Sequence, residues 1–395
     1  MTAPTWVERS LDQVATSLAR RRKRISHFSL IGRSPFNPVK VSRCDEGCHI
    51  MDRGATTKAR RRNAEGGLPV PDITATLPWR LNLALAALLT AVNVVQFAAL
   101  PLWLLPLDAR WGLLLVPVAL TTPMLWSLLH EAVHGILHPN GRANDAVGRA
   151  LAVLFGSPFR VLRLGHLMHH RFNRTDLDRT EVFADRDATG LRARAVYFGR
   201  LLGGLYLAEA AASIAAVFPR PLVAGTVALA FGAEADDGRT MRRAAERQLL
   251  DPCALRELRA DGLAVIAVFA AAFWLYGSWW WMLALALLGR AFLISFHDNA
   301  YHYGTPLDDV LYSYNLRLPR PLAALVLNFN YHAVHHRRPA LPWTRLPRAF
   351  RDSGEAFDGG LVPVSLRQLS GPLPASRLAR TPEGGPALER GTAAT

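Results

Sequence analysis

The sequence predicts an all-α integral membrane protein, with about four transmembrane helices in two hairpins and a cytosolic, histidine-rich cap. One observation behind this prediction is that 50% of the residues are hydrophobic and gather in long uncharged stretches. Another is that ten of the thirteen histidines lie in four short stretches. We expect a basic, disordered tail over 1–75, a membrane domain over 76–350, and a carboxy-terminal tail rich in Pro, Gly and Arg over 351–395.

The amino-terminal tail carries two runs of positive charge, Arg20–Arg24 and Arg60–Arg62. No apolar core follows the basic start, so the tail lacks the form of a secretory signal. A solvated tail is the favoured interpretation, and binding to anionic lipid head groups is the alternative. Translation could also start at Met51 instead of Met1, which would leave a short basic tail.

The first predicted hairpin follows this tail. Leu81–Leu105 is a stretch of 25 uncharged residues, long enough to cross a hydrocarbon layer of about 30 Å at about 1.5 Å per residue. After a short turn, Trp111–Leu129 forms a second uncharged stretch and ends at His130 and His134. Both histidines are therefore expected on the same side of the membrane as the amino terminus.

The next region is basic, since residues 139–196 carry ten arginines against six acidic residues. An excess of arginine marks cytoplasmic loops, so the histidine stretches should face the cytoplasm, in what we expect to be a bacterial inner membrane. Residues 197–232 are largely apolar, with Glu209 as the acidic exception in the stretch before Pro219. A tilted span, a hairpin and a surface helix all remain open for this region.

The second predicted hairpin begins with the uncharged stretch Gly262–Gly289. A turn near Gly277–Ser278 would let the chain return to the cytoplasmic side at His297 and His302. Trp279–Trp281 would then lie at the far interface, where indole rings are favoured.

Three histidine stretches have spacings that suit metal ligands: His130-Glu-Ala-Val-His134, His166-Leu-Met-His169-His170 and His332-Ala-Val-His335-His336. On a helix, residues three and four apart are neighbours. A single zinc ion needs only three or four ligands, whereas these stretches supply eight histidines and His302 supplies a ninth. Two metal ions with four or five ligands each account for this number.

Other residues near these stretches have open roles. Glu131 and Asp298 are candidates for orienting ligand imidazoles by hydrogen bonds, and a surface role is the alternative for each. His138 and His297 are expected to be structural, because their spacing turns them away from the ligand faces. For His297, a hydrogen bond that supports a ligand histidine is the alternative.

The order and spacing of these stretches resemble the membrane fatty acid desaturase and hydroxylase superfamily, over roughly residues 80–350. The resemblance implies a desaturase-like domain with four membrane helices under a cytosolic cap. It also implies a non-haem centre of two irons that uses O2. The ligands that it implies are His130, His134, His166, His169, His170, His302, His332, His335 and His336.

The stretch that begins at Asn330-Tyr331, with Pro342-Trp343 after it, resembles acyl-lipid desaturases more than alkane hydroxylases. The expected enzyme is therefore an O2-dependent fatty acid desaturase, acting on an acyl-lipid, acyl-CoA or acyl-carrier substrate. The alternative within the superfamily is a hydroxylase or ketolase of a hydrocarbon or carotenoid. In bacterial carotenoid ketolases a similar first box is also followed by glycine, which here is Gly135. An alternative of another class is a non-enzymatic metal-binding or transport protein, but transporters place ionisable groups near the midplane of the bilayer.

Electrons should come from an external donor such as a ferredoxin, a rubredoxin or a cytochrome. The sequence has no cysteine set for an iron–sulfur cluster and no glycine-rich nucleotide loop. Arginines near the boxes offer a docking surface for an acidic donor, and contact with solvent or lipid head groups is the alternative. These are Arg160, Arg163, Arg171, Arg337 and Arg338. The net charge of +15 does not point to nucleic acid, since no stretch interleaves aromatic and basic residues.

Overall fold

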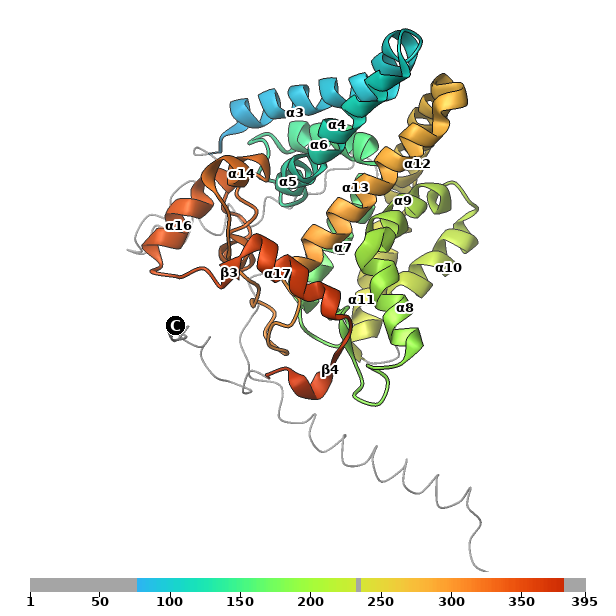
Figure 1. The fold of residues 1–395 in the computed structure, drawn as a ribbon. Helices are drawn as coiled ribbons and strands as arrows, with labels where there is room; N and C mark the ends of the chain where they lie inside the picture. The colour runs from blue at the N-terminus through green and yellow to red at the C-terminus, as the bar shows by residue number, and fades with distance from the viewer. Residues whose placement is uncertain (1–76, 232–235, 380–395) are drawn as a thin grey trace, which may run out of the picture. The chain divides into compact units, whose positions relative to one another are not determined.

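The structure, a computed structural model, describes residues 77–231 and 236–379, all within one compact unit. The predicted disordered tail over 1–75 and the choice between Met1 and Met51 therefore lie outside the described residues. Within these ranges the chain is mostly helical, with a few strands of two residues each (Figure 1). The all-α prediction is confirmed for this part of the chain.

The first apolar arm contains helices that reach away from the rest of the unit (Figure 1). Its elements are α3 (Trp79–Val94), η3 (Val95–Leu104), η4 (Ala109–Leu114), α4 (Leu115–Leu120) and α5 (Thr122–Val133). Two segments of this arm, 26 and 25 residues long, have the length and hydropathy needed to cross a membrane. Their apolar side chains are largely exposed, Trp103 by 68% and Leu113 by 72%, which suits contact with lipid.

The second segment of this arm is not one continuous helix. The chain passes from α4 to α5 at Thr121, between Pro117 and Pro123. A proline has no N–H to donate, so the regular helical pattern is interrupted. The hydroxyls of Thr121 and Thr122 donate to the carbonyls of Val118 and Ala119 at 2.7 and 2.6 Å, as is common where a membrane helix is broken.

A third apolar segment covers 49 residues and is also long enough to cross a membrane. It consists of α12 (Pro252–Tyr276), η6 (Gly277–Trp279) and α13 (Trp280–Ala300). Gly277 has φ 49° and ψ −119°, which breaks the helical path where the sequence predicts a turn. Consequently α12 and α13 lie side by side (Figure 1).

The remaining helices lie at one end of these segments and along them (Figure 1). They are α6 (Gly141–Phe155), α7 (Phe159–Phe172), α8 (Leu191–Gly199), η5 (Arg200–Gly204), α9 (Leu205–Ala216), α10 (Arg220–Phe231) and α11 (Asp236–Leu249). Neither α9 nor α10 is among the segments long enough to cross a membrane. The main hydrophobic core lies between α5, α6, α7 and α13, with Leu128, Leu129 and Phe155 fully buried.

The carboxy-terminal part folds over the ends of these helices. Its helical elements are α14 (Arg320–Leu325), α15 (His332–Arg337), η7 (Trp343–Arg345), α16 (Leu346–Asp352), α17 (Leu361–Arg367), η8 (Gln368–Ser370) and η9 (Ala375–Arg377). Two parallel strand pairs anchor it. They join β1 (Val182–Phe183) to β4 (Leu373–Pro374) and β2 (Leu316–Arg317) to β3 (Gly359–Gly360). Residues 351–379 of the predicted tail thus belong to the folded unit.

The pair α17–η8 has an inverted polarity. Gln368 is fully buried, where its Nε2 donates to the Phe296 carbonyl at 3.0 Å and its Oε1 accepts from Asn299 at 2.6 Å. In contrast, Val362 and Leu366 are exposed by 66% and 54%. A helix that faces water buries its apolar side chains and exposes its polar ones, and this pair does the reverse. Its outer face therefore suits contact with lipid.

Candidate metal centre

Four segments bring the predicted histidine ligands together. They lie at the end of α5, along α7, just after α13 and on α15. Each position follows from a local pattern, because α5, α7 and α15 present histidines at helical spacings of three and four. The histidines form one group of five and one group of four, and the ligand atoms within each group lie within 4.8 Å of one another. The five are His130, His134, His166, His170 and His335, and the four are His169, His302, His332 and His336.

The ring nitrogens face one another at close range. In the group of five, the His166 Nε2 lies 3.0 Å from the Nε2 atoms of both His134 and His170. In the group of four, the His332 Nε2 lies 3.1 Å from those of His302 and His336. One imidazole nitrogen carries either a proton or a free lone pair, so it cannot make a hydrogen bond to two such neighbours at once. A cation at the centre of each group satisfies all of these lone pairs, and the donor sets therefore fit two metal ions.

Burial keeps most of these rings in the form that binds metal. Burial lowers the pKa of His134 to about 3, and the positive charge of Arg163 contributes to a smaller extent. Burial, with neighbouring rings contributing, also holds the pKa of six further rings well below its usual value: His166, His170, His302, His332, His335 and His336. Metal ligation requires neutral imidazole, so these rings are neutral at physiological pH before any metal binds.

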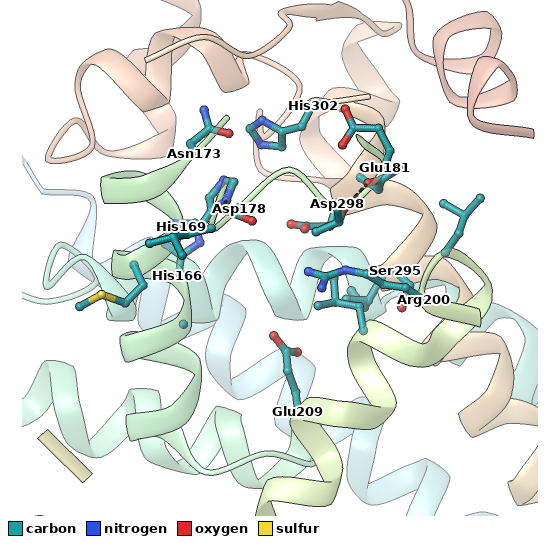
Figure 2. Close-up of a pocket in the computed structure, with 18 of the residues that line it drawn as sticks. His166, His169, Asn173, Asp178, Glu181, Arg200, Glu209, Ser295, Asp298 and His302 are labelled. Carbon is teal, nitrogen blue, oxygen red and sulfur yellow. Dashed lines mark hydrogen bonds and ion pairs between the residues drawn. The ribbon is translucent and has the colours of Figure 1, made fainter. Parts of the chain in front are cut away.

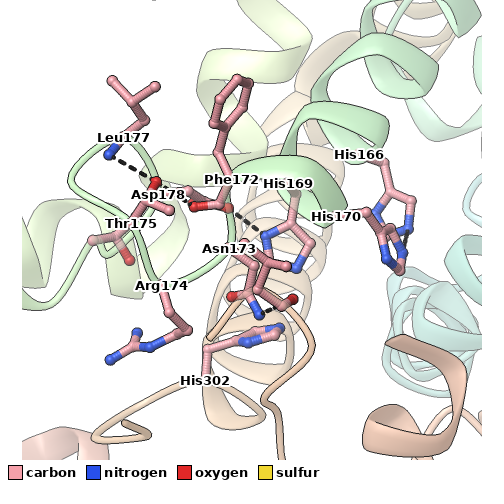
Figure 3. Close-up of polar contacts among 12 residues, drawn as sticks. His166, His169, His170, Phe172, Asn173, Arg174, Thr175, Leu177, Asp178 and His302 are labelled. Carbon is pink, nitrogen blue, oxygen red and sulfur yellow. Dashed lines mark hydrogen bonds and ion pairs between the residues drawn. The ribbon is translucent and has the colours of Figure 1, made fainter. Parts of the chain in front are cut away.

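His169 differs from the others because a carboxylate holds it. Its Nδ1 lies 2.5 Å from Oδ2 of Asp178 (Figure 3). Burial opposes the charged ring, but the charge and hydrogen bond of Asp178 raise the pKa of His169 overall. A ligand histidine that donates Nδ1–H to a carboxylate has a fixed tautomer and orientation, with Nε2 free for metal. Asp178 therefore positions His169, a role that the sequence analysis did not identify.

We expect Asp178→Asn to weaken metal affinity at the group of four by about 10- to 100-fold, the usual cost of losing such a partner. The chelator concentration that removes half of the bound iron measures this affinity. Asp176→Asn is the matched control, because Asp176 has the same chemistry in the same loop but an 81% exposed side chain that pairs with Arg179. Equal iron retention in the two variants would contradict the role of Asp178.

The two carboxylates singled out in the sequence lie in different surroundings. Asp298 lines a cavity together with His169 and His302 (Figure 2). The Glu131 carboxylate accepts from the backbone N–H of Trp343 at 3.3 Å and so joins α5 to η7. Within residues 77–231 and 236–379, neither carboxylate makes a hydrogen bond to a ligand ring. Their predicted role in orienting imidazoles stays a prediction.

Among residues 77–231 and 236–379, His138 and His297 lie outside both groups. His138 Nδ1 accepts from the backbone N–H of Asn140 at 3.0 Å. The His297 Nε2 lies 3.1 Å from the hydroxyl of Tyr301. Both contacts are of the structural kind expected from the spacing of these residues.

A buried ion pair fixes the loop that follows His302. The Arg174 guanidinium lies 2.8 Å from Glu181, and both side chains are only 1% exposed. Arg174 also donates to the Thr305 carbonyl at 2.8 Å, and Glu181 accepts from the N–H of Gly304 at 3.2 Å. The pair thus connects the loop after α7 to the residues next to His302.

The third histidine box lies on a short element. Helix α15 has six residues and no side-chain cap at its amino-terminal end. Leu327 and Asn328 precede it with φ of 46° and 56°, in the left-handed region that non-glycine residues rarely adopt. Contacts with α16 hold the helix, since Val334 packs against Leu346 and Phe350.

The arginines near the boxes divide into two sets. Arg160 pairs with Glu257 at 2.6 Å, Arg163 pairs with Asp145 at 2.7 Å, and Arg337 pairs with Glu355. These three belong to the fold. Arg171 and Arg338 are exposed and remain available for a partner.

Fold and site together define a class, a helical membrane protein with nine histidines in two adjacent metal-ligand groups. The family model for fatty acid desaturases matches residues 109–367, a range that includes all nine histidines. The chain belongs to the fatty acid desaturase family, and the predicted resemblance is confirmed. A search of curated proteins finds no match to the chain. Family and apolar helices together identify an oxidoreductase that is integral to a membrane and has a lipid as its substrate class.

Proposed function

We propose that this chain uses O2 to introduce a carbon–carbon double bond into a fatty acyl chain, as the sequence predicts. The observation that carries the proposal is the pair of histidine groups, one of five and one of four, whose ring nitrogens converge. Two iron ions bound there would supply the oxidising chemistry that removes hydrogen from an unactivated methylene. All nine predicted histidines serve as the ligands in this proposal.

The protein's own residues would hold the metal ions, orient the ligand rings and exclude water from the site. Seven of the nine histidines are buried and two, His134 and His169, are half-buried; Asp178 holds His169 in one orientation. Asp298, which lines the cavity, and Glu131, which contacts η7, would orient ligand imidazoles by hydrogen bonds. In the overall reaction, O2 takes one hydrogen from each of two adjacent methylenes of the acyl chain. It also takes two electrons and two protons from outside the protein, and it is reduced to two molecules of water.

In the membrane, we infer four crossings in two hairpins, because Gly277 divides the third apolar segment into two helices. The histidine groups would then face the cytoplasm of a bacterial inner membrane, as the arginine-rich loop over 139–196 favours. A ferredoxin, rubredoxin or cytochrome would supply the electrons. Its acidic surface would contact the exposed side chains of Arg171 and Arg338.

The test is to express the chain in a bacterial host and to compare its fatty acids with those of cells that express His335→Ala. We expect a new double bond that the variant lacks, and about two irons per purified chain. Zinc alone in the purified protein would overturn the diiron centre. An unchanged fatty acid profile with an oxidised hydrocarbon or carotenoid would instead assign the chain to the hydroxylases and ketolases.

A further inference from the structure

Three charged side chains from separate elements enter the cavity beside the histidines. Arg200 comes from η5, Glu209 from α9 and Asp298 from α13, and Figure 2 shows all three pointing into the same space. His166 of the group of five and His169 and His302 of the group of four line the same cavity. A group held by the three charges therefore lies next to both candidate metal positions.

None of these three side chains makes a hydrogen bond or a close ion pair with another residue in the described part of the chain. They are nevertheless close enough for each charge to affect the others. Glu209 and Asp298 are half-buried, where a charged group without a partner is costly, whereas Arg200 is exposed. Glu209 in particular belongs to α9, whose other residues are apolar or small, so packing of that helix gives no reason for a carboxyl group.

The arrangement of Arg200 is built into the backbone. It begins η5, a segment of five residues where the chain kinks at Gly203, which has φ 138°. A side chain at Gly203 would meet the Cβ of Ala291 on α13 at 3.3 Å, so η5 packs closely against α13. Just beyond it, the N–H of Tyr206 donates to Ser295 Oγ at 3.2 Å. This kink places Arg200 beside the helix that carries Asp298.

The chemistry of the cavity selects a neutral polar group. Burial, with the charge of Asp298 contributing, raises the pKa of Glu209 to about 8, so this group is mostly protonated at neutral pH. Arg200 and Asp298 then balance each other, and the lining offers both donors and acceptors of hydrogen bonds. A polyanionic carrier would meet the carboxylate of Asp298. The volume is about 270 Å³, just below the range of roughly 300–1,000 Å³ typical of pockets for drug-sized ligands.

We propose that Arg200, Glu209 and Asp298 bind the neutral head group of the lipid substrate, a hydroxyl or an amide, so that oxidation occurs within a few carbon atoms of that group. This inference rests on the proposed function, because it assigns the substrate of the same site. Arg200 donates to the hydroxyl or carbonyl oxygen. The two acidic side chains accept from the O–H or N–H of the same head group.

The test measures binding of four tritiated probes to the full chain in phospholipid nanodiscs, corrected for partition into empty nanodiscs. The probes are dodecan-1-ol, dodecanamide, methyl dodecanoate and dodecane, which share a chain and differ in the head group. We expect the alcohol and the amide to bind at least about tenfold more tightly than dodecane, as hydrogen bonds to charged groups predict. Binding is measured with and without iron, so failure of the diiron proposal would not affect this result.

The double variant Arg200→Met/Glu209→Leu should abolish this preference. Leucine suits the apolar helix α9, so the variant should fold at least as stably as the parent, and its melting temperature and iron content verify this. Arg192→Met is the matched control, since it removes an exposed arginine from α8. Three results would overturn the inference. Dodecane could bind as tightly as the alcohol and the amide, or the double variant could keep the preference. The methyl ester could also bind as tightly as the alcohol.

Discussion

Replacing His170 by alanine is expected to remove iron from both histidine groups and to lower activity by more than about a hundredfold. The His170 Nε2 lies 3.0 Å from the Nε2 atoms of His166 and His335 in its own group. Its ring centroid is also only 4.4 Å from that of His336 in the other group. Loss of a residue that merely supports a ligand already costs about 10- to 100-fold, so loss of a ligand at the junction of both groups should cost more.

Metal analysis of the purified His170→Ala protein measures the effect, with activity followed by the lipid product. The control is His138→Ala, which removes a histidine four residues beyond His134 that lies outside both groups. This control should keep its iron and its activity. Two irons per chain in the His170→Ala protein would show that His170 is not a required ligand, and one iron per chain would show that the two groups bind metal independently.

The second large effect concerns stability. Arg174→Met should lower the free energy of unfolding by about 3–5 kcal/mol, because it leaves the buried carboxylate of Glu181 without its partner. The substitution also removes the hydrogen bonds that Arg174 donates to the Thr305 and Pro306 carbonyls. The loop that follows His302 should therefore loosen, and unfolding in detergent, followed by urea titration, measures the change.

A double variant and a surface control make this result specific. Arg174→Met/Glu181→Leu removes both charges, so it should recover much of the stability that the single variant loses. Arg186→Met should leave stability unchanged, because Arg186 is 89% exposed and lies 3.6 Å from Asp187. A single variant as stable as the parent would mean that water already reaches the Arg174–Glu181 pair.

The sequence predicted those parts of the site that depend on local spacing. Uncharged length identified the apolar arms, and separations of three and four placed histidines on common helix faces. The partner of His169 could not be found in this way. Asp178 is nine residues away in a polar loop, and only the turn in which Arg174 donates its N–H to the Asp178 carbonyl at 2.9 Å brings it back to the ring.

Other features escaped because their cause lies in tertiary contacts. The composition of residues 351–379 favours a tail, whereas the structure folds them onto the domain through strand pairs. Strands of only two residues show no periodicity by which the sequence could reveal them. The buried Gln368 on α17–η8 likewise breaks the usual rule that polar residues face outward. The cavity charges Arg200 and Glu209 stand in separate elements, and no sequence motif joins them.

The shortness of α15 has a consequence for how the protein matures. Isolated helices of fewer than about 12 residues are barely stable in water, and this one of six residues carries three of the nine ligands. Its order must come from α16 and from the metal itself, so metal capture completes the fold as well as the centre. Protein made under iron starvation should therefore open first at 327–338, a segment where hydrogen exchange and proteolysis would be fastest. Cellular iron supply would thus set the lifetime of the protein as well as its activity.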